Sequence, residues 1–307
     1  MKYSSADKQV REAAKHISAH GIDRDQTRHS PYATSSVRTE ENFKGSMKSL
    51  VEHMKEHKLG GIWDVDKNIA KDWLDQRAGE VSQETLDFDR QQINKWLEYK
   101  DGQSVDKIQS QKEEDGNKLK DISRYYTSEQ IEKIKEAQTE KHSCATQVAH
   151  EGGLRASELH TIAKKEEQPA SERDYRDDLN DYKGQEQIEY TVIGKGGLVR
   201  EITLSKATSE RLEQKRLEEP QTVKDRGVNY TSRYNIGGGK NWSASFTRAS
   251  QRQLNWSKGA HGTRHSYAQN RLVELQQNGY TEEDGKEIVS QEVGHFRIEQ
   301  TEEYLRK

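Results

Sequence analysis

Apolar side chains recur at helical spacing through most of this chain, and this periodicity restricts its fold more than any other feature. Between residues 40 and 57, one face of a helix would carry five apolar residues, Phe43, Met47, Leu50, Val51 and Met54. Shorter stripes follow at residues 69–74 and from Ser82, a candidate N-cap, to residue 97. Three or four short helices of this kind predict a small helical bundle.

The apolar residues that form these stripes are scarce. Hydrophobic residues make up 30% of the 307 residues and charged residues 34%, so the helices must be largely solvated. A chain this polar could be disordered, but its 13 Tyr, 5 Trp and 4 Phe and its periodicity favour a folded protein with disordered pieces. The single cysteine, Cys144, cannot form an internal disulfide, and its apolar-periodic surroundings favour a buried hydrophobe over a catalytic thiol.

Composition also divides the chain into segments. Residues 1–35 lack a sustained apolar stripe and predict a polar N-terminal arm or a weak helix, while residues 36–100 hold the helical bundle. Residues 101–121 are rich in charge and nearly free of aliphatic side chains, which is typical of a solvated linker. Residues 122–307 form the second predicted domain. No leader and no run of about 18 apolar residues occurs, which predicts a soluble, cytoplasmic protein with no membrane partner.

The second domain combines helices with a β-hairpin. Thr127 and Gln130 fit a capping box, and the helix they begin leads into a second one that would continue to about residue 162. Residues 190–193 and 199–204 read as two strands about a glycine turn, with Lys195 at the tip. The predicted fold class is therefore mainly α with two domains, a helical bundle followed by an α+β domain with a small antiparallel hairpin or sheet.

The net charge of −3 does not indicate a nucleic-acid partner, but its distribution is uneven. Residues 165–189 hold nine acidic and four basic residues and suit a solvated loop. Residues 224–271 hold nine basic residues against Asp225 alone, interleaved with tyrosine and tryptophan, as in a surface that binds a phosphate backbone. The candidate DNA-binding residues taken from this basic segment are Lys240, Arg248, Arg252 and Lys258.

Four local patterns follow one another in the second domain. The first is Arg155 with Glu158 in the sequence Gly-Leu-Arg-Ala-Ser-Glu-Leu on an expected helix, and the second is Lys195 at the hairpin tip. The third is His261-Gly-Thr-Arg264-His265 at the start of a helix running to Gly279. The fourth is Gly294-His295, followed nine residues after His295 by Tyr304. Taken singly, each has an ordinary structural explanation, such as a surface ion pair or a packing tyrosine.

Together these residues suit metal-free phosphoryl transfer. Arginines bind nonbridging phosphate oxygens, lysine and histidine move protons, and a phenol oxygen can act as the nucleophile. The sequence has no acidic cluster for two metal ions, and it lacks His-Glu-x-x-His, Cys-x-x-Cys and nucleotide phosphate-loop motifs. It therefore predicts no metal and no cofactor.

In this order the motifs resemble those of the tyrosine recombinases, or phage integrases. The resemblance covers residues 122–307 through motifs and about 39–100 through the layout of a helical core-binding domain. It implies the catalytic residues Arg155, Lys195, His261, Arg264, His295 and Tyr304, with Glu158 and His265 in support. It also implies that Tyr304 forms a 3′-phosphotyrosyl bond with DNA, without metal or ATP, and that strands are exchanged through a Holliday junction.

The resemblance further implies the partners. These are double-stranded DNA carrying recombination sites, a homotetramer assembled on that DNA, and an accessory DNA-bending or directionality protein, in a nucleoid-associated enzyme that serves a mobile element. Arg90 and Lys95 in the first domain are candidates for reading bases.

Some features depart from compact family members. The acidic stretch before Lys195 and the segment between His261 and His295 are longer, and only three residues follow Tyr304, where many relatives have a tail that packs on a neighbouring subunit. The alternatives are a type IB topoisomerase-like nicking and closing enzyme, a DNA-binding regulator that has lost catalysis, and a hairpin-telomere resolvase.

Overall fold

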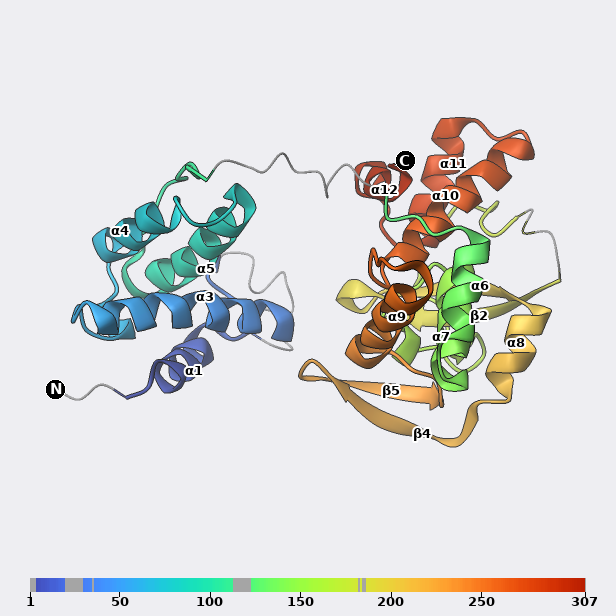
Figure 1. Ribbon diagram of the computed structural model, residues 1–307, viewed down its shortest axis with the longest axis horizontal. Coiled ribbons are helices and arrows are strands. Elements are labelled where there is room, and N and C mark those ends of the chain that lie inside the picture. Colours follow the sequence, from blue (N-terminus) through green and yellow to red (C-terminus); the bar gives the residue numbers. More distant parts are fainter. Residues whose placement is uncertain are drawn as a thin grey trace. The chain divides into compact units, whose positions relative to one another are not determined.

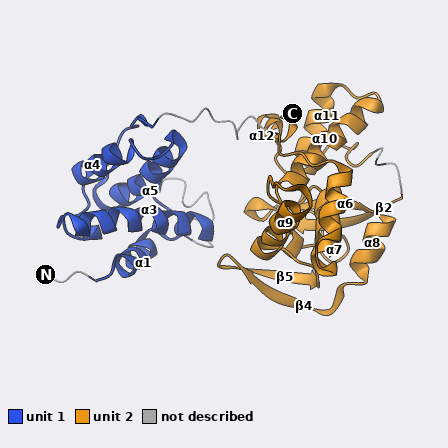
Figure 2. Cartoon of the chain, viewed as in Figure 1, with its two compact units in different colours: residues 1–117 blue, residues 118–307 orange. Residues whose placement is uncertain are grey.

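The computed structural model describes residues 4–19, 30–34, 36–112, 123–181, 183 and 186–306. The chain divides into two compact units, residues 1–117 and 118–307 (Figure 2). The division falls inside the segment 101–121 that was predicted as a linker. Each unit has a hydrophobic core of its own.

Unit 1 is helical. It contains α1 (Ala6–Ile17), α3 (Val37–Glu56), the short 3₁₀ helix η1 (Ile62–Asp64), α4 (Lys67–Arg77) and α5 (Gln83–Asp101) (Figure 1). The predicted apolar stripe of α3 is buried, and Trp96 of α5 is also buried and donates its indole N–H to the Ile62 carbonyl at 2.9 Å. Ser82 occupies the N-cap of α5 as predicted, and Gly102 ends that helix in the left-handed conformation.

Within residues 1–35, predicted as a polar arm or a weak helix, residues 6–17 are helical, and their apolar stripe was not predicted. These residues form α1, which packs against α3 and buries Ala6, Val10, Ala13, Ala14 and Ile17. Three of those five residues are alanines, whose small side chains allow close helix packing but add little to an apolar stripe. Residues 1–3, 20–29 and 35 of the predicted arm lie outside the described residues.

The first half of the predicted linker belongs to unit 1. Val105 is buried, and the Asn94 side chain accepts from its N–H at 2.8 Å and donates to its carbonyl at 3.0 Å. Farther along, the Ser110 N–H donates to Oε1 of Gln83 at 2.8 Å. One buried valine and a few paired polar groups hold this segment, which charge composition alone did not indicate. Residues 113–121 lie outside the described residues.

Unit 2 begins with two helices and an antiparallel sheet. Thr127 and Gln130 form the predicted capping box of α6 (Ser128–Glu136), and α7 (Glu140–Glu151) follows. The strands β1 (Ala163–Lys164), β2 (Gln187–Ile193) and β3 (Val199–Ser205) pair in that order. β2 and β3 form the predicted hairpin, in register from Gln187 with Ser205 to Ile193 with Val199, and the turn η3 (Lys195–Gly197) joins them.

The helix expected to continue to residue 162 ends at Glu151 instead. Gly153 has φ +61°, and a Cβ there would lie 2.5 Å from the Tyr267 ring, so only glycine fits this turn. Arg155 was predicted to lie on a helix, but it lies in the turn before η2 (Glu158–His160).

The rest of unit 2 comprises a second hairpin and five helices. They are α8 (Lys206–Glu213), β4 (Arg216–Asp225), β5 (Val228–Tyr234), α9 (Gly239–Leu254), α10 (Gly262–Gln277), α11 (Glu282–Glu292) and α12 (Ile298–Leu305). The hairpin of β4 and β5 runs along one edge of unit 2, and the sequence did not predict it because its strands are polar and β4 is mostly exposed (Figure 1). In the described part of the chain, no helix is long and apolar enough to cross a membrane.

Two further features of unit 2 bear on the sequence predictions. Cys144 is buried in the core, and burial raises the pKa of its thiol to about 11, so it packs as an apolar residue as predicted. The acidic stretch 165–189 is not simply solvated: Arg176 pairs with Asp284 and Glu287 of α11 at 3.2 and 2.7 Å. Arg176 and Lys183 bind this stretch to α11 and α10. The net negative charge of the stretch gave no indication of these contacts.

Candidate active site

The residues singled out as catalytic come from separate segments of unit 2. Arg155 lies in the turn after α7, His261 is the N-cap of α10 with Arg264 in its first turn, His295 follows α11, and Tyr304 is on α12. Apart from Lys195, the structure brings all of them into one cluster, together with Glu158 and His265.

The carboxylate of Glu158 is the centre of this cluster. Its Oε1 is 2.7 Å from Nη1 of Arg155, and its Oε2 accepts from the Arg155 main-chain N–H and from Nη2 of Arg200, each at 2.8 Å. Nη1 of Arg264 is 3.6 Å from the same Oε2. Burial favours the protonated acid, but the charges of Arg200, Arg264 and Arg155 outweigh it and lower the pKa of Glu158 to about 2. Glu158 is therefore an anion that holds three guanidinium groups.

Arg264 is fully buried beneath the cluster. Its Nη1 donates to the Gly153 carbonyl at 2.6 Å, and its Nη2 donates to the Val293 carbonyl. Burial lowers the pKa of Arg264 to about 10, which still leaves it charged at neutral pH. The Arg155 side chain is 23% exposed, so it is the arginine that a bound phosphate can reach most directly.

Tyr304 packs against three histidines. Its ring centroid lies 5.1 Å from that of His295, 4.7 Å from that of His265 and 5.4 Å from that of His261. Its hydroxyl is 3.4 Å from Nε2 of His295, whose Nδ1 is 3.3 Å from Oγ1 of Thr301. The phenol oxygen therefore lies next to a ring nitrogen, and Cζ of Arg264 is 5.3 Å from the centre of the tyrosine ring.

All three histidines favour the neutral form. Burial lowers the pKa of each imidazole, and neighbouring positive charges, Arg264 among them, lower it further. The pKa values are about 4 for His261, about 3 for His265 and about 3 for His295. A neutral imidazole has one nitrogen with a free lone pair, and Nε2 of His295 is the ring nitrogen beside the Tyr304 hydroxyl.

Lys195 is exposed at the tip of the β2–β3 hairpin, and among the described residues no hydrogen bond or ion pair joins its side chain to the cluster. The base of the hairpin does lie beside it: a Cβ on Gly194 would be 3.5 Å from Oε1 of Glu158, and the Ile193 N–H donates to Oγ1 of Thr161 at 2.9 Å. The hairpin is thus anchored at Ile193, two residues away from Lys195.

The other predicted DNA-contact residues belong to α9, to the loop after it and to unit 1. Lys240, Arg248 and Arg252 are exposed on α9, where Arg252 also donates to the Ala137 carbonyl at 2.6 Å, and the Lys258 ammonium is 5.2 Å from the centre of the Trp256 ring. In unit 1, Arg90 and Lys95 make internal contacts. Nη1 of Arg90 donates to the Val105 carbonyl and Nζ of Lys95 to the Pro31 carbonyl, each at 3.2 Å.

Sequence reasoning missed Arg200, a buried member of the cluster. A period-two pattern was available as a signal, because residues 200, 202 and 204 alternate on one face of β3, where Ile202 and Leu204 are buried. An arginine in line with two buried aliphatic residues needs an anionic partner, and Glu158 supplies it.

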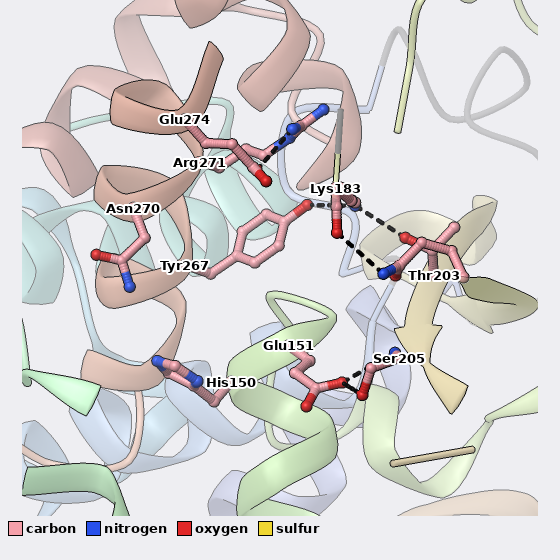
Figure 3. Close-up of a pocket in the computed structure, with 10 residues that line it drawn as sticks. His150, Glu151, Lys183, Thr203, Ser205, Tyr267, Asn270, Arg271 and Glu274 are labelled. Atoms are coloured by element: carbon pink, nitrogen blue, oxygen red, sulfur yellow. Dashed lines mark hydrogen bonds and ion pairs between the residues drawn. The ribbon is translucent and has the colours of Figure 1, made fainter. Parts of the chain in front are cut away.

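A cavity of about 470 Å³ lies elsewhere, bounded by the end of α7, β3 and α10 (Figure 3). Several of its polar side chains bond one another: the Tyr267 hydroxyl points toward Lys183, 3.0 Å from its Nζ, and Ser205 donates to Glu151 at 3.0 Å. Nε2 of His150, which also lines the cavity, has no hydrogen-bond partner in the part of the chain that the structure describes. Among the described residues, no three His, Cys, Asp or Glu side chains are grouped as a metal ion would require.

Comparison with known proteins gives a match in structure only. No protein-family model matches the sequence, and no curated protein matches it. The fold is similar to that of the XerH site-specific recombinase bound to palindromic difH substrate in a post-cleavage complex, with a TM-score of 0.56 and 13% identity over 97% of this chain and 90% of that chain. The XerH pre-cleavage complex with difH gives a TM-score of 0.56 and 14% identity over 99% and 94%. The chain therefore has the two-domain, mainly helical fold of a site-specific recombinase, as its resemblance to the tyrosine recombinases implied.

Proposed function

We propose that this protein is a tyrosine recombinase, a site-specific DNA recombinase or integrase that cleaves and rejoins DNA through a covalent bond to Tyr304. The observation that carries the proposal is the convergence of a phenol hydroxyl, two arginines held by one buried carboxylate, and neutral histidines from segments far apart in the sequence. The fold shared with XerH supports it.

In the proposed reaction, the Tyr304 oxygen attacks the scissile phosphorus and a 3′-phosphotyrosyl bond forms as the bond to the 5′-oxygen breaks. The phosphodiester is exchanged for another ester of similar energy, so the residues of the chain carry the reaction without ATP. Strand joining is the reverse attack, by the 5′-hydroxyl of the partner strand, and it regenerates the free phenol.

The proton of Tyr304 has a nearby acceptor. An ordinary phenol has a pKa of about 10, so it must lose its proton as it attacks. Nε2 of His295 is 3.4 Å from the hydroxyl and from Nη2 of Arg264, and the low pKa of His295 keeps the ring neutral before DNA binds. A phosphate anion bound beside these arginines would offset their charge and raise the basicity of the ring. We assign this proton to His295, with His261 and His265 packing the ring in place.

Arg155 and Arg264 stabilise the charge that develops on the nonbridging oxygens. A guanidinium matches phosphate in a planar, two-pronged geometry that lysine does not offer. Glu158 fixes the Arg155 side chain through Oε1 and its main-chain N–H through Oε2 before DNA binds, so little reorganisation is needed in the transition state.

The proposed partner is double-stranded DNA. Lys240, Arg248, Arg252 and Lys258 would contact phosphates and make the affinity fall with salt. Arg90 and Lys95 could read bases only after releasing the carbonyls that they bind now. As in the family it resembles, the protein would act as a homotetramer on two sites through a Holliday junction, in the nucleoid, with an accessory DNA-bending or directionality protein, in the service of a mobile element.

The test is covalent trapping. The protein is mixed, in the presence of EDTA, with duplexes that have a randomised central segment and a nick at varied distances from it. When cleavage occurs close to a nick, the short fragment carrying the 5′-hydroxyl diffuses away and rejoining is blocked. We expect an adduct that survives denaturation, with mass spectrometry placing the nucleotide on Tyr304 and sequencing giving a shared site.

Other outcomes separate the alternatives. Tight binding without an adduct would favour a regulator that has lost catalysis. Adducts on unrelated sequences, together with relaxation of supercoiled plasmid, would indicate a type IB topoisomerase-like enzyme, and covalently closed ends would indicate a hairpin-telomere resolvase. An adduct that forms without EDTA but is lost when EDTA is present would contradict the metal-free scheme.

Lys195 is proposed as the general acid that protonates the departing 5′-oxygen. We expect Lys195→Ala to slow cleavage by roughly 10²–10⁴-fold on ordinary DNA and to recover most of that loss on a substrate with a bridging 5′-phosphorothiolate, whose sulfur leaves without a proton. The measurement is the single-turnover rate on both substrates. An equal defect on both would remove Lys195 from this role.

A further inference from the structure

We propose that Arg200 is a positioning residue of the cleavage reaction, which fixes the main chain leading to His295 relative to the Glu158 carboxylate. The inference rests on the proposed function, because it concerns how the same site is assembled. It assigns Arg200 a role within the protein, through the Glu158 carboxylate and the Glu292 carbonyl, and no contact with DNA.

The two ends of the Arg200 guanidinium have different acceptors. Nη2 donates to Oε2 of Glu158 at 2.8 Å, and Nη1 donates to the main-chain carbonyl of Glu292 at 2.7 Å. Arg264 bonds the next carbonyl, that of Val293. Two buried guanidinium groups therefore hold consecutive carbonyls at the end of α11, and both lie against the same carboxylate oxygen.

The main chain then passes directly over Arg200. Gly294 has φ +70°, and a Cβ at this residue would lie 2.9 Å from Cδ of Arg200. The next residue is His295, whose Nε2 faces the Tyr304 hydroxyl. The Arg200 side chain thus contacts the turn that precedes His295 on two sides, at the Glu292 carbonyl and at Gly294, and so fixes where that turn lies.

Arg200 also comes from the hairpin that carries Lys195. It lies on β3, one residue beyond the Ile193–Val199 pair that closes the turn. One side chain therefore connects three parts of the site: the hairpin, the carboxylate that holds Arg155, and the turn that carries His295.

The contact with Glu292 is to its main chain, and the Glu292 carboxylate belongs to a different cluster. That carboxylate accepts from Nε of Arg271 at 3.1 and 3.2 Å and from the Tyr267 hydroxyl at 2.7 Å. Arg271 is as deeply buried and as firmly paired as Arg200, but none of its hydrogen bonds or ion pairs in the described residues goes to Glu158. It is therefore a matched control for the loss of a buried arginine.

The experiment compares Arg200→Met, Arg200→Lys and Arg271→Met in the full chain. The probe is the nicked duplex recovered by covalent trapping with the wild-type protein. For each protein we would measure the single-turnover rate of adduct formation at saturating protein, the Kd for the duplex, and Tm. A displaced catalytic group costs about 100-fold in rate, so we expect that loss in Arg200→Met with a Kd within about threefold of wild type. Arg200→Lys should recover part of the rate, because an ammonium can still reach one acceptor.

Arg271→Met should lower Tm at least as much as Arg200→Met while cleaving within about threefold of wild type. Wild-type cleavage by Arg200→Met, or parallel rate losses in both methionine variants, would overturn the proposal. If Arg200→Met does not fold, Arg200→Lys decides the matter, because a wild-type rate in that variant is incompatible with positioning through both acceptors. Failure of the wild-type protein to form any adduct would contradict the proposed function itself, which is a separate result.

A double substitution tests whether Arg200 acts on cleavage through Glu158. If Arg200 acts through Glu158, adding Arg200→Met to Glu158→Gln should slow cleavage little beyond Glu158→Gln alone. Losses that multiply would show that the two side chains act independently.

Discussion

Tyr304→Phe should form no covalent adduct on any duplex and still bind DNA as the wild-type protein does. The substitution removes the nucleophilic oxygen and keeps the ring, which makes the packing contacts with His261, His265 and His295. The hydroxyl has a long contact of 3.4 Å with His295, so its loss should change the free energy of unfolding by no more than about 1 kcal/mol.

Denaturing gels of nicked duplex would measure the adduct, and a binding titration and a thermal melt on the same preparation would provide the controls. Residual adduct in Tyr304→Phe would mean that another side chain is the nucleophile. Loss of binding together with the adduct would mean that Tyr304 positions DNA instead.

Arg155→Ala and Arg264→Ala should each slow cleavage by at least roughly 10²–10³-fold, because each removes charge stabilisation of the phosphate in the transition state. Their effects on stability should differ. Arg264 is fully buried and bonds the Gly153 and Val293 carbonyls, so its loss should cost roughly 3 kcal/mol of folding free energy. Arg155 is partly exposed, and its loss should cost less.

Single-turnover rates at saturating protein, DNA affinity and Tm would separate these contributions. Most of the DNA affinity should remain in both variants, since one phosphate is a small part of a long backbone contact. If affinity and rate fell in equal proportion, the two arginines would be positioning DNA and not stabilising the transition state.

Much of the fold could be predicted because its signals are local. The stripe of α3, the capping box of α6 and the glycine turn between β2 and β3 each depend on residues within a few positions of one another. The order of the motif residues also predicted which side chains would form the site, and all but Lys195 meet around Glu158 and Tyr304.

The failures have physical causes of two kinds. Some elements have weak hydropathy: α1 buries small alanines, and β4 exposes most of its side chains. Others depend on a partner distant in sequence. The break after α7 is required by the ring of Tyr267 lying over Gly153, more than a hundred residues away.

The sequence by itself determined the candidate residues of the site, which are two arginines, a lysine, histidines and a tyrosine. Only the tertiary structure decided that Glu158 is ionised and pairs with several arginines, Arg200 among them. It also decided that His295 is the histidine whose ring nitrogen contacts the Tyr304 hydroxyl. The reason is that ionisation and hydrogen bonding in a buried site depend on burial and on charges brought together from distant segments, which spacing along the chain does not specify.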